Sequence, residues 1–308
     1  MRFKGGWAAA VLGVALIAVV WTLIAQRTRS VVSIEVQGGD GGGLPRATPK
    51  EEGLDGDAMA VGAARAFEAG AQALLITRHG HLVFEQYRHG VDAHSPVVAD
   101  ELARLLLTLA AGAVRPPVAL NSTVGFEGGA LATRISAASH MSYPQFLARA
   151  IWQPLNASSA RFLASVPGAL VRADCCFEAQ LLDWLRVGAL MLEDGRFEGT
   201  QVLPAGWIRR VINATADPGR GSGVWLAPSA VGSEPFASEG VFFIRGSGGT
   251  RLWMVPKFDL AVLLVSDARS GPTAVRPDDT RLPNVVMRAL HAEAAGGAHG
   301  LDALVPGH

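Results

Sequence analysis

The sequence predicts an α/β domain of the α+β sandwich type, in which an antiparallel sheet is flanked by helices, behind an N-terminal transmembrane helix. The chain has 308 residues, 49% of them apolar, which is enough for one large buried core. Strand-like runs occur early and late, whereas helical spacing occupies the middle and the end, an order typical of helices packed on an antiparallel sheet. A long uncharged segment comes first.

That uncharged segment covers residues 5–26, and at 1.5 Å per helical residue it reaches about 33 Å, enough to cross a bilayer core. We therefore expect residues 1–29 to form a single-pass membrane anchor. A cleaved secretory signal is the alternative. The best cleavage point would follow Ala25, where bulky Leu23 occupies a position that requires a small residue.

Composition divides the rest of the chain into three parts. Residues 30–53 are rich in glycine and proline, which predicts a flexible linker. Residues 54–294 form the expected globular domain. Residues 295–308 predict a disordered tail.

In the globular part, the first elements are a helix at 57–70 and a hairpin of two strands, 73–78 and 82–87. The turn of the hairpin contains His79 and His81, which we expect to point at solvent. Apolar residues at helical spacing then predict helices at 102–113, 130–150, 178–193 and 204–212. Strands are predicted at 223–226, 240–245, 251–255 and 260–265, followed by a helix at 280–294.

Charge and cysteine content argue against a nucleic-acid partner, a disulfide framework and a metal site. The 27 basic and 27 acidic residues cancel, so we expect no nucleic-acid partner. The two cysteines, Cys175 and Cys176, are neighbours that can close only a strained ring, so no disulfide framework is expected. No histidine or carboxylate lies near them at a recognisable ligand spacing, so we expect no metal and no other cofactor.

Several stretches of the chain resemble one known family in the same order. They are Leu44-Pro45-Arg46-Ala47-Thr48-Pro49 with Glu52-Gly53-Leu54, Tyr87-Arg88-His89-Gly90, Ile151-Trp152-Gln153-Pro154-Leu155, Asp183-Trp184-Leu185, Val202-Leu203-Pro204, and Gly246-Ser247-Gly248-Gly249 before Val255-Pro256. Together they resemble the β-lactamase-related serine hydrolases, which include class C β-lactamases, D-alanyl-D-alanine peptidases and esterases. The resemblance implies a β-lactamase/transpeptidase-like fold.

The family's chemistry needs a serine at the start of a helix, a lysine one turn later, a tyrosine motif, and a lysine or histidine on a strand that lines the site. The resemblance places Glu101 at the serine position, Arg104 at the lysine position and Ser247 at the strand position. No tyrosine occurs at 123–125, where its motif is expected. Glutamate is a poor acyl acceptor, and arginine keeps its proton far above neutral pH and is therefore no base there.

The family also places a helical subdomain between the serine helix and the tyrosine motif, whereas only about twenty residues separate them here. We therefore expect a truncated domain from which that subdomain is largely missing. Glu101 and Arg104, three residues apart on a helix, are expected to form an ion pair. The remaining cleft would be lined by Ser247, Gly248 and Gly249, in a turn between two strands, together with Trp253.

These observations predict a protein of the serine hydrolase family with weak or no hydrolase activity. It would be anchored in the inner membrane by residues 5–26, with its soluble domain in the periplasm or outside. One alternative is a non-catalytic module that binds peptidoglycan fragments, a small acyl compound or a partner protein. Another is an active esterase or amidase with a recruited nucleophile such as Ser247.

Overall fold

The centre of the fold is a five-stranded sheet in the order β3-β2-β11-β10-β9, with every neighbouring pair antiparallel. The computed structural model describes residues 32–120, 128–164, 172–213, 217–228, 233–246, 249–266 and 279–290. The strands are β2 (Ala71–Arg78), β3 (His81–Tyr87), β9 (Phe242–Arg245), β10 (Arg251–Val255) and β11 (Leu260–Ser266). The predicted antiparallel sheet is confirmed.

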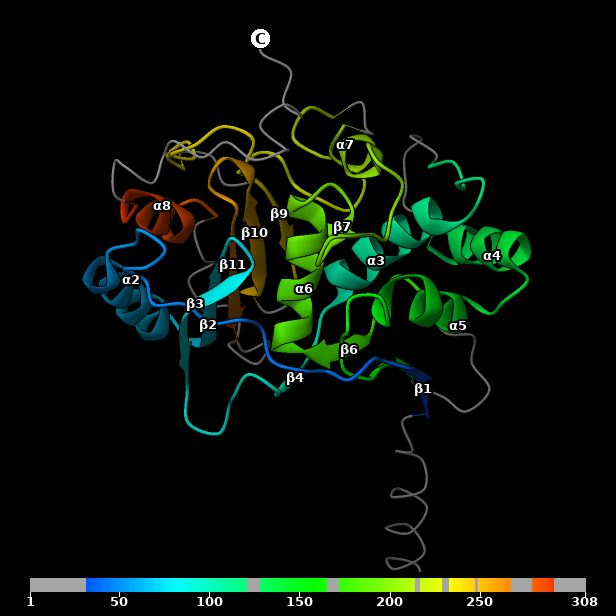
Figure 1. The fold of residues 1–308 in the computed structure, drawn as a ribbon, viewed down its shortest axis with the longest axis horizontal. Coiled ribbons are helices and arrows are strands. Elements are labelled where there is room, and N and C mark those ends of the chain that lie inside the picture. Colours follow the sequence, from blue (N-terminus) through cyan, green and yellow to red (C-terminus); the bar gives the residue numbers. More distant parts are fainter. Residues whose placement is uncertain are drawn as a thin grey trace, which may run out of the picture.

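Helices cover both faces of this sheet (Figure 1). On one face lie α2 (Gly56–Glu68) and α8 (Arg281–Arg288), which contact each other. On the other face α6 (Leu181–Leu192) packs against β10 and β11, and α3 (Asp100–Ala113) belongs to the same core. The predicted arrangement of helices on a sheet is therefore present.

The two cores follow from the alternation of side chains along a strand. In β2, Leu74 and Ile76 point into the core under α2 and α8, whereas Ala73 and Leu75 point into the core that contains α3 and α6. Because successive side chains of a strand point to opposite faces, a strand covered on both faces must be apolar throughout. This explains the continuous apolar run that made β2 recognisable in the sequence.

A second, four-stranded sheet lies beside the first, in the order β1-β5-β6-β4. Its strands are β1 (Val32–Val36), β5 (Ala160–Ala164), β6 (Phe177–Gln180) and β4 (Pro96–Val98). The small sheet brings chain segments from before and after α3 together at the point where that helix begins.

The linker predicted at 30–53 is wrong for its described part, because β1 pairs with β5. The glycines that follow β1 serve close packing. A Cβ added to Gly38 would lie 2.3 Å from the carbonyl oxygen of Ala157, and Gly39 donates its N–H to the same oxygen at 2.8 Å. The ordered domain therefore begins before residue 54.

The single helix predicted at 130–150 is also wrong, because the structure has two helices there. The chain forms α4 (Gly128–Ser139) and α5 (Tyr143–Leu147), separated by a turn at His140, whose φ is 55°. A capping box at Ser142 starts α5 anew, because the caps satisfy backbone N–H groups that a continuous helix would bond internally. The apolar spacing continues across the turn, so periodicity alone could not detect the break.

The remaining elements are short. They are a π-helical turn at Ala148–Trp152, a hairpin of β7 (Arg196–Phe197) and β8 (Thr200–Gln201), α7 (Trp207–Ile212) and a 3-10 turn at Pro256–Phe258. The strand predicted at 223–226 is reduced to two isolated bridges of Trp225, one to Phe243 and one to Arg220. The helix predicted from residue 178 begins as β6.

Among the described residues, no helix combines the length and the apolar character needed to cross a membrane. The anchor predicted at 5–26 and the tail predicted at 295–308 lie outside the described residues.

Candidate functional site

The candidate site is built around the first turn of α3, which the sequence resemblance identified as the helix of the family's nucleophile. The strand β4 leads directly into it, and the backbone N–H of Ala99 donates to the carbonyl of Phe177 in β6 at 3.0 Å. No side chain caps this helix start. Asp100 and Glu101 instead place carboxylates in the first turn, where the positive end of the helix dipole favours them.

Glu101 and Arg104 form an ion pair, as predicted, with 3.5 Å between the Oε1 and Nη1 atoms. Their side chains are 31% and 38% exposed. A pair this exposed on a helix contributes only about 0.2–0.5 kcal/mol to stability. The two opposite charges lie at the positions that the sequence resemblance assigns to the nucleophile and its base, and that assignment stays a prediction.

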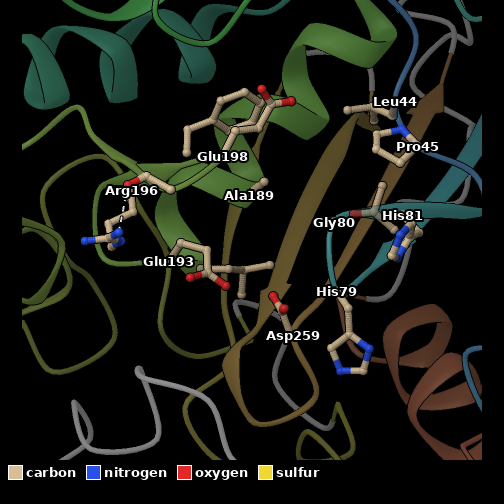
Figure 2. A pocket seen from close by; sticks show the side chains of 14 residues that line it. Leu44, Pro45, His79, Gly80, His81, Ala189, Glu193, Arg196, Glu198 and Asp259 are labelled. Atoms are coloured by element: carbon tan, nitrogen blue, oxygen red, sulfur yellow. Dashed lines mark hydrogen bonds between the residues drawn. The ribbon is translucent and has the colours of Figure 1, made fainter.

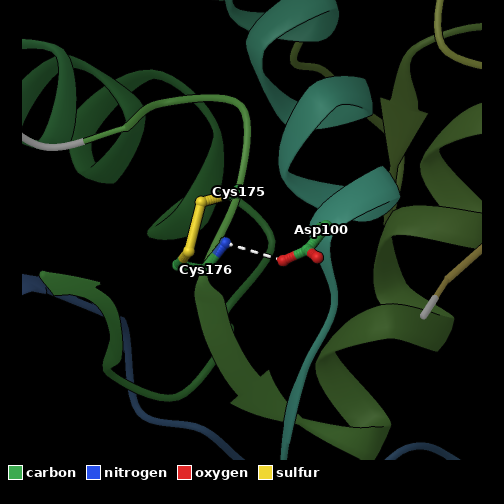
Figure 3. A group of neighbouring side chains, drawn as sticks. All are labelled: Asp100, Cys175 and Cys176. Carbon is green, nitrogen blue, oxygen red and sulfur yellow. Dashed lines mark hydrogen bonds between the residues drawn. A yellow bond between two sulfur atoms is a disulfide. The ribbon is translucent and has the colours of Figure 1, made fainter. Parts of the chain in front are cut away.

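Asp100 faces a cysteine pair that follows β5 in the chain (Figure 3). The backbone N–H of Cys176 donates to Asp100 Oδ1 at 3.0 Å. Cys175 and Cys176 are bonded to each other in a disulfide, which the sequence analysis did not expect. Since the partners are chain neighbours, this disulfide links no distant segments. Cys175 is buried, whereas Cys176 and Asp100 are partly exposed.

Residues 223–225 bring the edge of the main sheet next to α3. A Cβ added to Gly223, whose φ is 84°, would lie 3.3 Å from the Cα of Leu105. Trp225 exchanges two backbone hydrogen bonds with Phe243 of β9, at 2.7 and 2.9 Å. The segment therefore lies between α3 and the edge strand β9 and contacts both.

Three of the four predicted binding residues, Ser247, Gly248 and Gly249, belong to the connection between β9 and β10, whereas Trp253 belongs to β10 itself. Gly246 donates its N–H to the carbonyl of Thr250 at 2.7 Å, so the two strands are joined by the turn that the sequence predicts. Gly249 lies in this turn with a φ of 94°. Ser247 and Gly248 lie outside the described residues, and the role predicted for them stays a prediction.

Trp253 does not suit the binding role predicted for it. Its ring is fully buried in the core under α2 and α8, and its Nε1 donates to the carbonyl of Asp279 at 2.8 Å. The carboxylate of Asp279, also buried, lies 3.0 Å from Nε of Arg251 and 3.9 Å from Nε of Arg245. This buried charge cluster secures the same end of the sheet as the turn. Sequence reasoning missed it because its members are not periodic.

A cavity of about 360 Å³ lies at the C-terminal end of α6 (Figure 2). Its lining includes Glu193 and Glu198 on one side and the hairpin residues His79 and His81 on the other. The start of α6 lies near α3, because α6 directly follows β6. The helix has 12 residues and is about 18 Å long, so the cavity at its end is separate from the first turn of α3.

The sequence predicts that His79 and His81 point at solvent. Both side chains are partly exposed, but each also contacts Glu52. The Nδ1 atom of His79 lies 2.7 Å from one carboxylate oxygen of Glu52, and Nδ1 of His81 lies 3.0 Å from the other. The two side chains are 34% and 41% exposed. Glu52 therefore holds both sides of the hairpin turn.

No protein-family model matches the sequence, and no curated protein does either. Solved structures do match. A Bacillus anthracis protein described as a 6-aminohexanoate-dimer hydrolase has a TM-score of 0.63 at 14% identity, covering 86% of this chain and 90% of that one. A β-lactamase of Mycobacterium bovis has a TM-score of 0.54 at 17% identity, covering 76% and 99%. A penicillin-binding protein homologue of Caulobacter crescentus has a TM-score of 0.53 at 13% identity, covering 77% and 99%.

These similarities establish the fold. The chain has the fold of the β-lactamase and penicillin-binding-protein type of serine hydrolase, as its motifs predicted. Fold alone does not determine activity, which depends on the residues of the site.

Proposed function

We propose that this chain is a membrane-anchored, β-lactamase-related protein with weak or no hydrolase activity of its own. The fold supports the relationship to serine hydrolases. The observation that carries the loss of activity is the ion pair of Glu101 and Arg104 in the first turns of α3.

The chemical argument concerns the proton of the nucleophile. Acyl transfer in this type of site needs a hydroxyl and a base that accepts its proton near neutral pH. Arg104 donates to Glu101, and a guanidinium group offers only hydrogen-bond donors and no acceptor, so it cannot serve as that base. Glu101 has no hydroxyl to acylate. Neither half of the family's nucleophile pair is present at these two positions.

Anchoring rests on the uncharged segment at 5–26. The strand β1 begins at Val32, so five residues, 27–31, separate the end of this segment from the folded domain. Five residues span no more than about 18 Å when fully extended. We propose that the domain is held close to the outer face of the inner membrane, on the periplasmic or external side.

A second candidate function is ligand binding without catalysis, for peptidoglycan fragments, a small acyl compound or a partner protein. The cavity of about 360 Å³ favours it, because its volume is within the range of small-molecule sites. Apolar Leu44 and Phe197 line it together with carboxylates, among them Glu193. Such a module would be stabilised by its ligand without turning it over.

The test compares hydrolysis of a chromogenic cephalosporin and of a nitrophenyl ester by the full chain, purified in detergent, with hydrolysis by a Glu101→Ala, Arg104→Ala variant. We expect both proteins to hydrolyse the two compounds at the rate of buffer alone. A wild-type rate well above that of the variant would contradict the proposal, because it would give the pair a catalytic role. Equal rates above buffer that disappear in Ser247→Ala would indicate a recruited nucleophile.

A further inference from the structure

We propose that reduction of the Cys175–Cys176 disulfide creates a binding site for one thiophilic divalent cation such as zinc, with the two thiolates and the Asp100 carboxylate as ligands. This site is independent of any hydrolase activity. It differs from the expectation drawn from sequence spacing, because Asp100 lies far from the cysteines in the chain and only folding brings it to them.

The distances between the three donors suit one metal ion. Asp100, Cys175 and Cys176 each contribute an oxygen or sulfur atom, and these atoms all lie within 4.8 Å of one another. A tetrahedral zinc ion with Zn–S bonds of about 2.3 Å holds two sulfurs about 3.8 Å apart, and an oxygen and a sulfur slightly closer. Once the S–S bond opens, shifts of about 1 Å bring all three donors to such positions.

Backbone contacts hold the two segments of the site together. The hydrogen bond from Cys176 N–H to Asp100 Oδ1 joins the cysteine loop to the start of α3. On the other side of the loop, a Cβ added to Gly128 would lie 2.3 Å from Cβ of Asp174, so the first residue of α4 packs closely against the residue before Cys175. The carboxylate and the sulfurs are therefore positioned by contacts that do not involve the disulfide.

The ligand set predicts a site with an open position. A dithiol reductant transfers two electrons and two protons to the S–S bond, which yields two protein thiols, and the reductant becomes a disulfide. Binding of the cation then releases one proton from each thiol, because the thiolate is the ligand. Three protein ligands leave the fourth tetrahedral position for water or an external ligand.

The experiment uses the full chain in detergent, either oxidised or reduced anaerobically with a phosphine that is then removed. Zinc affinity is measured by competition with a chromogenic chelator, and cadmium is used to detect thiolate-to-metal charge-transfer absorption. We expect the reduced chain to bind one zinc ion and to show the cadmium–thiolate band. We expect the oxidised chain, and a Cys175→Ser, Cys176→Ser variant, to show neither.

The carboxylate is tested with a matched pair. Removal of groups that only support metal ligands costs about 10–100-fold in affinity, so Asp100→Asn should weaken zinc binding by at least about tenfold. Glu178→Gln removes a nearby carboxylate that pairs with Arg161 and should leave the affinity unchanged. Equal zinc binding by the oxidised and reduced wild-type chains would overturn the proposal, as would equal affinities of reduced wild type and Asp100→Asn. The comparison of oxidised with reduced wild type needs no substitution and so remains decisive if a variant misfolds.

Discussion

Replacing Arg186 with methionine should destabilise the protein strongly, because Arg186 compensates a buried charge. Its side chain is 3% exposed, and Nη1 lies 2.8 Å from Oδ1 of Asp183, which is fully buried. Asp183 Oδ1 also accepts the N–H of Ser158 at 3.2 Å. Arg186 in addition donates to the carbonyl of Gly42, so one guanidinium ties α6 to the glycine-rich segment after β1.

The expected magnitude follows from the burial of both groups. Removing one partner of a buried ion pair leaves the other charge uncompensated and costs about 3–5 kcal/mol of unfolding free energy. For a domain of this size that corresponds to a fall in melting temperature of about 6–20 °C, measured by thermal unfolding of the full chain in detergent.

Two controls distinguish the effect of an uncompensated buried charge from the effect of removing an arginine in general. Arg209, on α7, is exposed, and Arg209→Met should change stability by no more than about 0.5 kcal/mol. In a variant with both Asp183→Leu and Arg186→Met, apolar groups replace the whole pair, and most of the lost stability should return. A loss below about 1 kcal/mol for Arg186→Met alone would refute this account of the buried ion pair.

The remaining predictions concern pH, packing and the ion pair of α3. Burial raises the pKa of Asp183 from 3.8 to about 6. The folded state therefore binds this proton more tightly than the unfolded chain, which adds about 3 kcal/mol to the unfolding free energy below pH 3.8. This contribution is lost as the pH rises through about 6. Unfolding of the wild type measured from pH 4 to 8 should show this loss, and Asp183→Asn should not. Gly112→Ala should lower the unfolding free energy by about 1–3 kcal/mol, measured by thermal unfolding, because the added Cβ would lie 2.3 Å from the ring of Trp207. Gly129→Ala is the control and should leave the unfolding free energy unchanged, because its Cβ would meet open space. Glu101→Ser with Arg104→Lys should lower the unfolding free energy by less than about 1 kcal/mol, because the exposed pair contributes little; a larger loss would mean that the pair is structural.

Much of the fold could be predicted because its core elements have strong local patterns. The strand predicted at 251–255 coincides with β10, and the helix predicted at 102–113 lies within α3. Both are mainly apolar elements whose side chains are buried in the cores, so burial and local pattern agree. The order of the family-like motifs then predicted the fold, which the solved structures confirm.

The failures occur where long-range contacts decide the local structure. Composition around Gly38 suggested flexibility, yet that glycine is needed because the backbone of Ala157 passes close by. The turn at His140 interrupts a regular apolar pattern with one left-handed residue. At the candidate site, the pairing of Glu101 with Arg104 could be predicted from spacing alone. The meeting of Asp100 with the cysteines could not, because it depends on how β6 leads the chain past α3.

The most direct test of the central claim is the intact mass of the full chain after separate incubation with a fluorophosphonate and with a penicillin, with untreated protein as the reference. Because Glu101 and Arg104 pair with each other and provide neither a hydroxyl nor a base, we expect the mass of the folded protein to remain that of the untreated chain with both reagents. A stoichiometric adduct that maps to a single serine would contradict the account and identify that serine as the nucleophile of an active enzyme.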